Sequence, residues 1–411
     1  MSKEILINNN GFETRIALID GGLTSEFWLE RQQQSSVVGN IYKGRVQKVL
    51  PGLQAAFIDI GLAKSAFIHV SDFAEVERDV DKSVDLISSL LHEGQLLVVQ
   101  VYKDQIGSKG ARVTTQISIP SRYLVMMPNA PELLAISSRI VEEGERTRLL
   151  GVMEKINQDN EDFGLIARTN ADHIEKPLLE HDWKFLRRLW RKVAERIETQ
   201  KIPSLIYSEF SLAKRVVRDF ITEELTQITV DSHDIHLKVK DFVADFAYEW
   251  PGEVKWYQGS RPLFDQFNAE DEIERILNKK VDLKSGGNLV FDQNEAMTTV
   301  DVNTGQYVGF KSLEDTAFKT NLEAAQVVAR QLRLRNIGGI IIVDFIDMAD
   351  PEHKKQVHQT LEENLALDSA RTNVLGFTAL NLMEITRKRT TENIRDVVCE
   401  PCNKCRGSGY I

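Results

Sequence analysis

Short apolar runs separated by turn residues dominate the first third of the chain, and this pattern predicts β-strands. Residues 1–35 contain two such runs around an Asn-Asn-Gly turn, which predicts an opening strand pair. A helical stretch at 83–92 interrupts five further runs, which lie at 41–49, 54–60, 65–70, 96–103 and 111–118. Five short strands with one intervening helix predict an OB barrel.

Helical and strand-like patterns mix in the rest of the chain. Helices are predicted at 182–199, 209–226, 312–334 and 352–368. Strands are predicted at 163–168, 227–240, 296–303, 339–346 and 372–386. The fold class predicted by this mixture is an α+β multidomain protein.

Alternation in the barrel strands places two aromatic residues on a polar face. In the runs 54–60 and 65–70, alternate positions form an apolar side, and Phe57 and Phe67 lie on the opposite side. Rings in such places stack on unpaired bases, although a second domain that covers this face would explain them equally well. The first barrel strand adds a face suited to a phosphate backbone, formed by Lys43, Arg45 and Gln47.

Two aspartates lie in strongly strand-like segments. Asp301 and Asn303 are two residues apart and therefore share a face of their strand. The run before Asp344 is continuously apolar, which predicts a strand buried on both faces, where a carboxylate is costly unless it is paired or binds a metal. Two converging carboxylates supply the oxygen ligands that Mg²⁺ prefers. The alternative is a structural role in salt bridges with arginines such as Arg330 or Arg333.

Two further motifs carry candidate chemistry. GLIARTN ends a strand with Arg168 and Thr169, whose guanidinium and hydroxyl groups suit a terminal phosphate, although such pairs are usually solvated. Cys402 and Cys405 form a CxxC pair followed by glycines, which is typical of a zinc knuckle. Zinc takes four ligands, so two chains would have to share the site; Cys399 is a third candidate, and iron–sulfur ligation or free thiols remain open.

Composition narrows the class of protein. The chain has 411 residues, with 61 acidic and 51 basic residues and a net charge of −10, which argues against a generic nucleic-acid binder but permits local basic patches. No apolar run approaches the roughly 20 residues that span a bilayer, and the N-terminus has no signal-peptide layout. All three cysteines lie between 399 and 405, which argues against a disulfide framework. We therefore expect a cytoplasmic protein without a membrane partner.

The stretch VGNIYKGRVQKVLPGLQAAFIDIGLAKSAFIHVSD resembles the RNA-binding OB module, of the type named after ribosomal protein S-one, in the ribonuclease E/G family. The resemblance runs through the whole chain and includes GLIARTN, LVFDQNEAMTTVDVNTG, TNLEAAQVVARQLRLRNIGGIIIVDFIDM and the cysteine tail. The ribonuclease G branch is the closer one, because no long C-terminal half follows. Family members continue into a small assembly domain that is not present here, which leaves assembly beyond a dimer open.

The resemblance implies a magnesium-dependent endoribonuclease that cleaves single-stranded RNA, leaves a 5′-phosphate and a 3′-hydroxyl, and is stimulated by a 5′-monophosphate. Its substrates would be ribosomal RNA precursors and messenger RNA. By resemblance, Asp301 and Asp344 bind the catalytic Mg²⁺ and Asn303 accompanies them. The resemblance also assigns RNA contacts to Phe57, Phe67 and Lys109. It implies a 5′-phosphate sensor that comprises Val125, Arg168 and Thr169. Cys402 and Cys405 would hold a structural Zn²⁺ shared between the subunits of a homodimer.

The resemblance also implies a domain order. It comprises a split RNase-H-like domain (1–35 and 206–276), an inserted OB barrel (36–118), a 5′-sensor region (119–205), a deoxyribonuclease-I-like catalytic domain (277–398) and a zinc link (399–411). The rival hypothesis is a non-catalytic RNA-binding protein or chaperone that contains an OB barrel. The carboxylates discriminate between the two, because a pure binder has no need of a buried pair.

Overall fold

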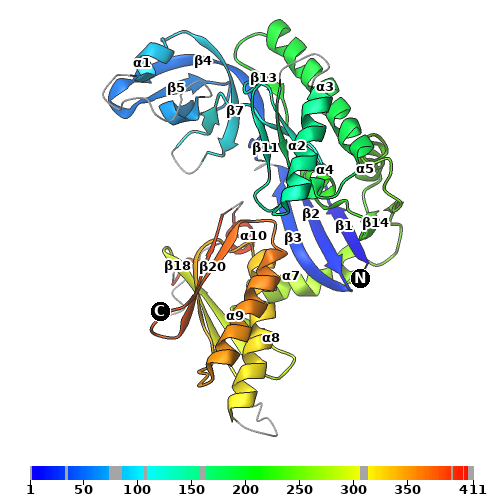
Figure 1. The fold of residues 1–411 in the computed structure, drawn as a ribbon, viewed down its shortest axis with the longest axis vertical. Helices are drawn as coiled ribbons and strands as arrows, with labels where there is room; N and C mark the ends of the chain where they lie inside the picture. The colour runs from blue at the N-terminus through cyan, green and yellow to red at the C-terminus, as the bar shows by residue number, and fades with distance from the viewer. Residues whose placement is uncertain are drawn as a thin grey trace. The chain divides into compact units, whose positions relative to one another are not determined.

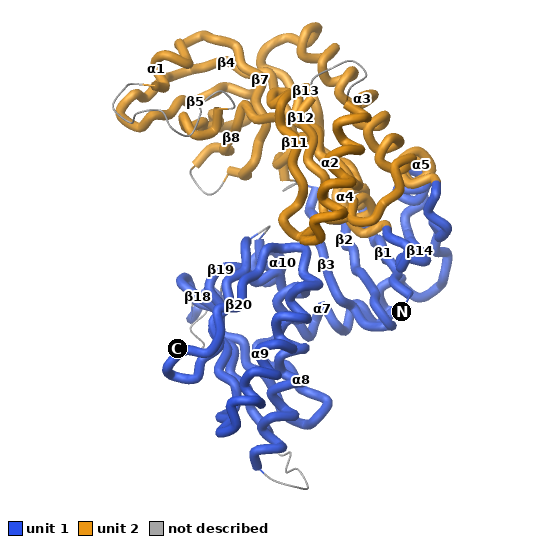
Figure 2. The backbone as a smooth tube through the Cα atoms, in the orientation of Figure 1, with its two compact units in different colours: residues 1–32, 222–240, 249–411 blue, residues 33–221, 241–248 orange. Residues whose placement is uncertain are grey.

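The computed structural model (Figure 1) describes residues 2–32, 36–73, 86–105, 109–157, 163–305, 313–389, 392–400 and 402–405. The chain divides into two compact units (Figure 2). One comprises 1–32, 222–240 and 249–411, and the other comprises 33–221 and 241–248. The second unit is therefore inserted into the first.

A five-stranded sheet opens the first unit. Its strands are β1 (Lys3–Asn9), β2 (Glu13–Asp20), β3 (Leu23–Arg31), β14 (Leu225–Val230) and β15 (Glu253–Trp256), in the order β15-β14-β1-β2-β3. The first three are antiparallel, and β14 and β15 add parallel to β1. The predicted strand pair at 1–35 was incomplete, because a turn at Gly21 and Gly22, both with positive φ, begins a third strand.

A closed five-stranded barrel lies in the second unit, as predicted for an OB fold. Its strands are β4 (Ile41–Leu50), β5 (Ala55–Asp59), β6 (Ala66–His69), β7 (Leu96–Lys103) and β8 (Arg112–Thr114), and β7 pairs back with β4. Helix α1 (Leu86–Leu90) falls in the predicted stretch 83–92, whose first residues lie outside the described part of the chain. Inside the barrel, fully buried side chains include Ile58, Ile68, Val99 and Val113.

The second unit also holds a four-stranded sheet with the order β11-β12-β10-β9. These strands are β9 (Ile119–Pro120), β10 (Leu124–Met127), β11 (Leu134–Ile136) and β12 (Gly164–Ala167), and β13 (Ser204–Tyr207) pairs with β4. The helices of this region are α2 (Glu143–Asn157), α3 (Lys176–Thr199) and α4 (Leu212–Phe220). The predicted strand 163–168 and helix 182–199 are confirmed as β12 and α3, with α3 beginning earlier.

The segment 227–240 was predicted wrongly as strand throughout. Its first part forms β14, but helix α5 (His233–Phe246) begins within it. The buried residues Val239, Phe242 and Phe246 follow helical spacing, which tertiary packing favours over the β-propensity of the segment.

The C-terminal part of the first unit is a six-stranded sheet. Its strands, in spatial order, are β16 (Lys280–Asp282), β17 (Asn288–Gln293), β18 (Met297–Asn303), β19 (Gly339–Asp344), β21 (Leu382–Arg387) and β20 (Thr372–Phe377). The helices are α6 (Leu263–Gln266), α7 (Ala269–Leu277), α8 (Leu313–Leu334), α9 (Pro351–Ala366) and α10 (Ile394–Val398). Helices α8 and α9 lie along one face of the sheet (Figure 1). Their buried side chains share a core with the sheet.

One prediction about this sheet was wrong. The run ending at Asp344 is not buried on both faces, because Ile341 and Val343 are buried whereas Ile340 and Asp344 are exposed. Alternate residues of β19 point to opposite faces, and the helices cover only the face of Ile341 and Val343. The continuous apolar run arose because the uncovered face is itself partly apolar.

None of the helices in the described part of the chain combines the length and the apolar character that crossing a bilayer requires.

Candidate active site

Two carboxylates meet on the open face of the six-stranded sheet. Asp301 on β18 and Asp344 on β19 are register partners in a parallel pair, so both side chains leave the same face, and both are exposed. Asn303 follows on the same face and donates a hydrogen bond from Nδ2 to Asp301 Oδ2 at 2.8 Å. The sheet therefore brings together the three residues predicted for catalysis.

The cross-strand partners of this pair on the outer strands are apolar. Val290 on β17 lies opposite Asp301, and Leu382 on β21 lies opposite Asp344. Within the described residues, neither aspartate forms an ion pair. Like charges on adjacent strands repel, so a divalent cation bound between the two carboxylates would stabilise this arrangement. The donor set therefore fits Mg²⁺.

The arginines considered as structural partners of these aspartates are engaged elsewhere. Arg330 Nη2 lies 2.6 Å from Glu272 Oε1. Arg333 donates a hydrogen bond to the carbonyl oxygen of Asn364 at 2.9 Å. The two carboxylates are thus not held by these salt bridges.

Helix α8 fixes the loop that follows Asp344. The fully buried Asn321 donates from Nδ2 to the Ile346 carbonyl oxygen at 2.8 Å and accepts from the Ile346 N–H at 3.0 Å. Glu314 accepts hydrogen bonds from the backbone N–H groups of Ala349 and Asp350, which hold the pKa of Glu314 below its usual value. We did not predict these roles; the signal for Asn321 was an amide on the apolar face of a helix.

A glycine allows the chain to approach the end of β18. A Cβ atom added at Gly287 would lie 2.5 Å from the Asn303 carbonyl oxygen, which is shorter than a van der Waals contact. The turn between β16 and β17 can therefore pass directly beside Asn303 only with glycine at position 287.

The outer face of the barrel carries the predicted aromatic pair. Phe57 and Phe67 are register partners on β5 and β6, and their ring centroids lie 5.9 Å apart in an edge-to-face arrangement. Both are half-buried, and neither belongs to the buried core of the barrel. Arg112 is the register partner of Phe67 on β8, and the exposed Lys109 precedes Gly110, where an added Cβ would lie 1.9 Å from the Ser65 carbonyl oxygen.

A bulge alters which basic residue accompanies the rings. The register of β4 shifts between Val46 and Lys48, so Lys48 lies opposite Phe57. Lys43, in contrast, donates from Nζ to the carbonyl oxygen of Ile197 at 2.6 Å, which commits it to the end of α3. The sequence alternation indicated Lys43 and did not indicate Lys48.

The predicted sensor residues lie on β10 and directly after the end of β12. Val125 on β10 pairs with Ile166 on β12, and the backbone N–H of Arg168 donates to the Tyr123 carbonyl oxygen at 2.8 Å. Thr169 Oγ1 lies 2.9 Å from Ser137 Oγ. The strand pairing thus brings the three predicted residues into one region.

Two acidic residues organise this region. Arg168 Nη2 lies 2.7 Å from Asp219 Oδ1. Burial would raise the pKa of Asp219, but the guanidinium groups of Arg218 and Arg168 outweigh it and lower that pKa. The fully enclosed Asp182 on α3 accepts backbone hydrogen bonds from Tyr123 and Leu124, at the start of β10. We did not predict either role; the signal for Asp182 was a carboxylate between apolar residues of α3.

A second group of potential metal ligands lies in the same unit. Ligand atoms of Glu145, Asp172 and His173 lie within 4.8 Å of one another. However, Glu145 is buried and already receives two hydrogen bonds from Arg148, at 2.6 and 2.7 Å. A side-chain hydrogen bond from Arg148 is the main cause of the lowered pKa of Glu145. This carboxylate has a structural partner without a metal.

The cysteines follow helix α10. The backbone N–H of Cys399 donates to the Arg395 carbonyl oxygen at 2.9 Å, and Cys399 is the C-cap of the helix. Cys402 is exposed. Cys405 is half-buried and is the last residue of a turn at 403–405. The glycines that follow lie outside the described residues.

The comparisons with known proteins all point to the same family. The ribonuclease E/G family model matches residues 118–390. Over its whole length the chain is 48% identical to ribonuclease G of Escherichia coli strain K12, of which the alignment covers 85%. It is 46% identical, over 99% of its length, to ribonuclease G of Haemophilus influenzae, of which 84% is covered. It is also 34% identical over its whole length to ribonuclease E of Escherichia coli strain K12, of which 39% is covered.

Proposed function

This chain belongs to the ribonuclease E/G family and is an endoribonuclease, and we propose that it cleaves single-stranded RNA at a magnesium site formed by Asp301 and Asp344. The observation that supports this site is the register of β18 and β19, which pairs the two carboxylates on an open face without ionic partners among the described residues. The rival hypothesis of a non-catalytic RNA-binding protein is excluded by the family.

Each residue at the proposed metal site would have a different role. Asp301 and Asp344 would hold Mg²⁺, which lowers the pKa of a bound water and neutralises charge on the phosphodiester. Asn303 orients the Asp301 carboxylate through its 2.8 Å hydrogen bond and leaves the other carboxylate oxygen available for the metal. Asn321 and Glu314 fix the backbone of the loop that follows Asp344.

We infer that the aromatic face of the barrel binds the RNA. Each of Phe57→Ala and Phe67→Ala is expected to weaken the affinity for a short unpaired RNA by roughly 1–3 kcal/mol, because each ring offers a stacking surface outside the barrel core. Fluorescence anisotropy with uncleavable RNA measures the affinity, and the melting temperature is the control. A drop in melting temperature with unchanged affinity per folded molecule would show that the rings are structural.

The Val125, Arg168 and Thr169 region is the proposed 5′-monophosphate sensor. Arg168→Ala is expected to remove the preference for 5′-monophosphorylated over 5′-hydroxylated RNA and to leave cleavage of the latter near wild type. The reason is that Arg168 supplies the charged donor for the terminal phosphate. Initial rates on two RNAs that differ only at the 5′-end measure this ratio.

A matched control for Arg168 is Arg188→Ala on α3, whose guanidinium pairs with Asp245 in the same unit. It removes the same charge from an exposed helix face and should leave the substrate ratio unchanged. Equal loss on both RNAs in Arg168→Ala would instead indicate that Arg168 only anchors Asp219.

We propose that Cys402 and Cys405 bind a structural Zn²⁺ shared in a homodimer, and that the enzyme acts in the cytoplasm on ribosomal RNA precursors and messenger RNA. The composite sheet of β1–β3 and β14–β15 supports a split RNase-H-like domain. The sheet of β16–β21 with its helices on one face supports the proposed catalytic domain at 277–398.

A further inference from the structure

A pocket on the helix-covered side of the catalytic sheet contains a buried arginine with an unused donor. Arg335, directly after α8, is only 7% exposed. Its Nε donates to Gln331 Oε1 at 2.7 Å, but Nη2 is buried and has no hydrogen-bond partner among the described residues. A buried charged donor without a partner is costly, so this nitrogen marks a place where a ligand would stabilise the fold.

The guanidinium is held in place by its surroundings. Its Cζ lies 4.6 Å from the centroid of the Phe291 ring, so the ring face supports it from β17. Burial lowers the pKa of Arg335 to about 10. The negative charge of Glu272 opposes this shift, and the positive charge of Arg395 adds to it. Arg335 therefore remains a cation near neutral pH, and its position does not depend on a salt bridge.

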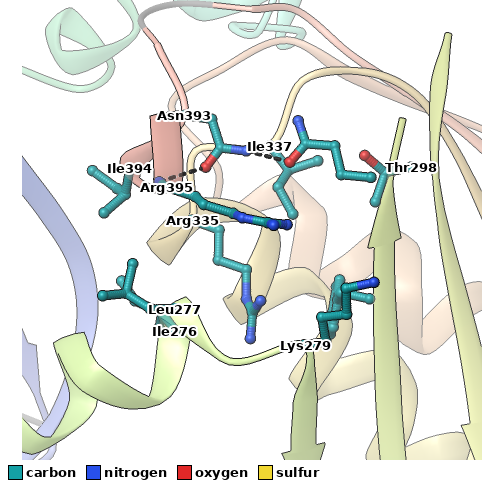
Figure 3. Close-up of a pocket in the computed structure, with 11 residues that line it drawn as sticks. Ile276, Leu277, Lys279, Thr298, Arg335, Ile337, Asn393, Ile394 and Arg395 are labelled. Atoms are coloured by element: carbon teal, nitrogen blue, oxygen red, sulfur yellow. Dashed lines mark hydrogen bonds between the residues drawn. The ribbon is translucent and has the colours of Figure 1, made fainter. Parts of the chain in front are cut away.

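The pocket wall carries an excess of positive charge. Figure 3 shows the side chains of Arg335 and Arg395 extending into the pocket from different segments. Lys279 also lines it, but its Nζ lies 2.5 Å from Asp292, so that charge is neutralised. Arg395 is exposed and makes no side-chain ion pair within the described residues. Two guanidinium groups are thus available to one ligand.

The volume of the pocket limits which ligands can enter it. The cavity has a volume of about 20 Å³, which is room for about one water-sized atom. A nucleobase or an aromatic side chain is therefore too large, whereas one oxygen of a larger anion fits, with the remainder of the anion on the solvent side near Arg395. Guanidinium groups favour the oxygens of phosphate because their paired donors match its geometry.

We propose that this pocket binds a phosphate group, with one oxygen accepting a hydrogen bond from Arg335 Nη2 and a second facing Arg395. The pocket is distinct from the proposed metal site, because Thr298 in its wall points to the buried face of β18 whereas Asp301 points to the open face. It is connected to the cysteine tail, since Asn393, Ile394 and Arg395 at the start of α10 form one wall.

The experiment is a titration of the full chain with inorganic phosphate, without magnesium, against chloride at equal ionic strength. Calorimetry and the melting temperature are the readouts. We expect saturable phosphate binding and a higher melting temperature in the wild type. Arg395→Gln should weaken the phosphate affinity about tenfold or more, because a charge-assisted hydrogen bond is lost. Arg191→Gln, which removes an exposed arginine from α3, is the matched control and should bind phosphate like the wild type.

Arg335→Lys keeps the charge but removes the forked donor, so it should also lose phosphate affinity. If Arg335→Lys does not fold because position 335 is buried, Arg395→Gln still tests the proposal. Displacement of phosphate by a 5′-hydroxyl RNA would identify the RNA backbone as the source of the ligand, and no displacement would identify free phosphate. No response of the wild type beyond that to chloride, or equal binding by wild type and Arg395→Gln, would overturn the proposal. Because none of these measurements involves cleavage, a failure of the proposed metal site would not affect them.

Discussion

Asp301→Asn and Asp344→Asn are each expected to abolish RNA cleavage while RNA binding survives. Both substitutions keep the size of the side chain and its place in the β18–β19 register, but they remove a charged metal ligand. A lost contribution of roughly 4 kcal/mol to transition-state stabilisation corresponds to about three decades in rate. Cleavage of a labelled unpaired RNA over a magnesium titration measures the effect.

The matched control is Asp347→Asn. Asp347 is exposed in the loop just beyond β19, so the variant changes the same net charge a short distance from the site. Near-wild-type cleavage is expected for it. Asp301→Asn or Asp344→Asn with near-wild-type rates in magnesium would show that the paired carboxylates are not the metal site. Affinity for uncleaved RNA, measured in parallel, separates a lost reaction from lost binding.

The second large effect is expected at the cysteine tail. The double variant Cys402→Ser with Cys405→Ser should convert a zinc-containing dimer into a monomer. Two thiolates from one chain leave a tetrahedral zinc half ligated, whereas two chains related by a two-fold axis complete it. Sedimentation with metal analysis should find one zinc ion per two chains in the wild type, and a strong chelator should reproduce the variant.

Cys399→Ser supplies the control for this prediction. The backbone of Cys399 already serves as the C-cap of α10, and its side chain is predicted to be outside the ligand set, so the dimer should persist. One zinc per chain, or a dimer that is indifferent to the chelator, would exclude a shared site. It would instead favour Cys399 as a third ligand in a site within one chain.

The elements that the sequence predicted well are those with a regular period. Strands β5, β6 and β8 alternate because one side faces a closed core, and α8 shows its packing stripe over its whole length. Strand β3 was missed because most of its residues are only half-buried, so the alternation is weak. The strand predicted at 227–240 stopped short of Phe242 and Phe246, whose spacing of four residues is helical and whose rings stack in α5.

The candidate site was predictable in its residue types but not in its geometry. The sequence indicated Asp301 and Asp344, yet their pairing depends on the register of two parallel strands separated by α8. The same holds for Lys48, which faces Phe57 only because of a bulge, and for Asp219, which meets Arg168 through tertiary contacts. These pairings depend on three-dimensional packing, because a local sequence pattern does not fix which strands pair or where a bulge shifts their register.

The insertion of one unit into the other has a consequence for biosynthesis. Strand β1 pairs with β14, and Asn8 is hydrogen-bonded to Asp231 across 223 positions. At roughly 5–20 residues per second, a ribosome needs about 10–40 s to deliver β14 after β1. During that interval the strands β1–β3 have emerged with an unpaired edge, whereas the barrel can already close. We therefore expect the nascent chain to complete the barrel first and to expose its N-terminal strand edge to chaperones until residue 230 has been synthesised.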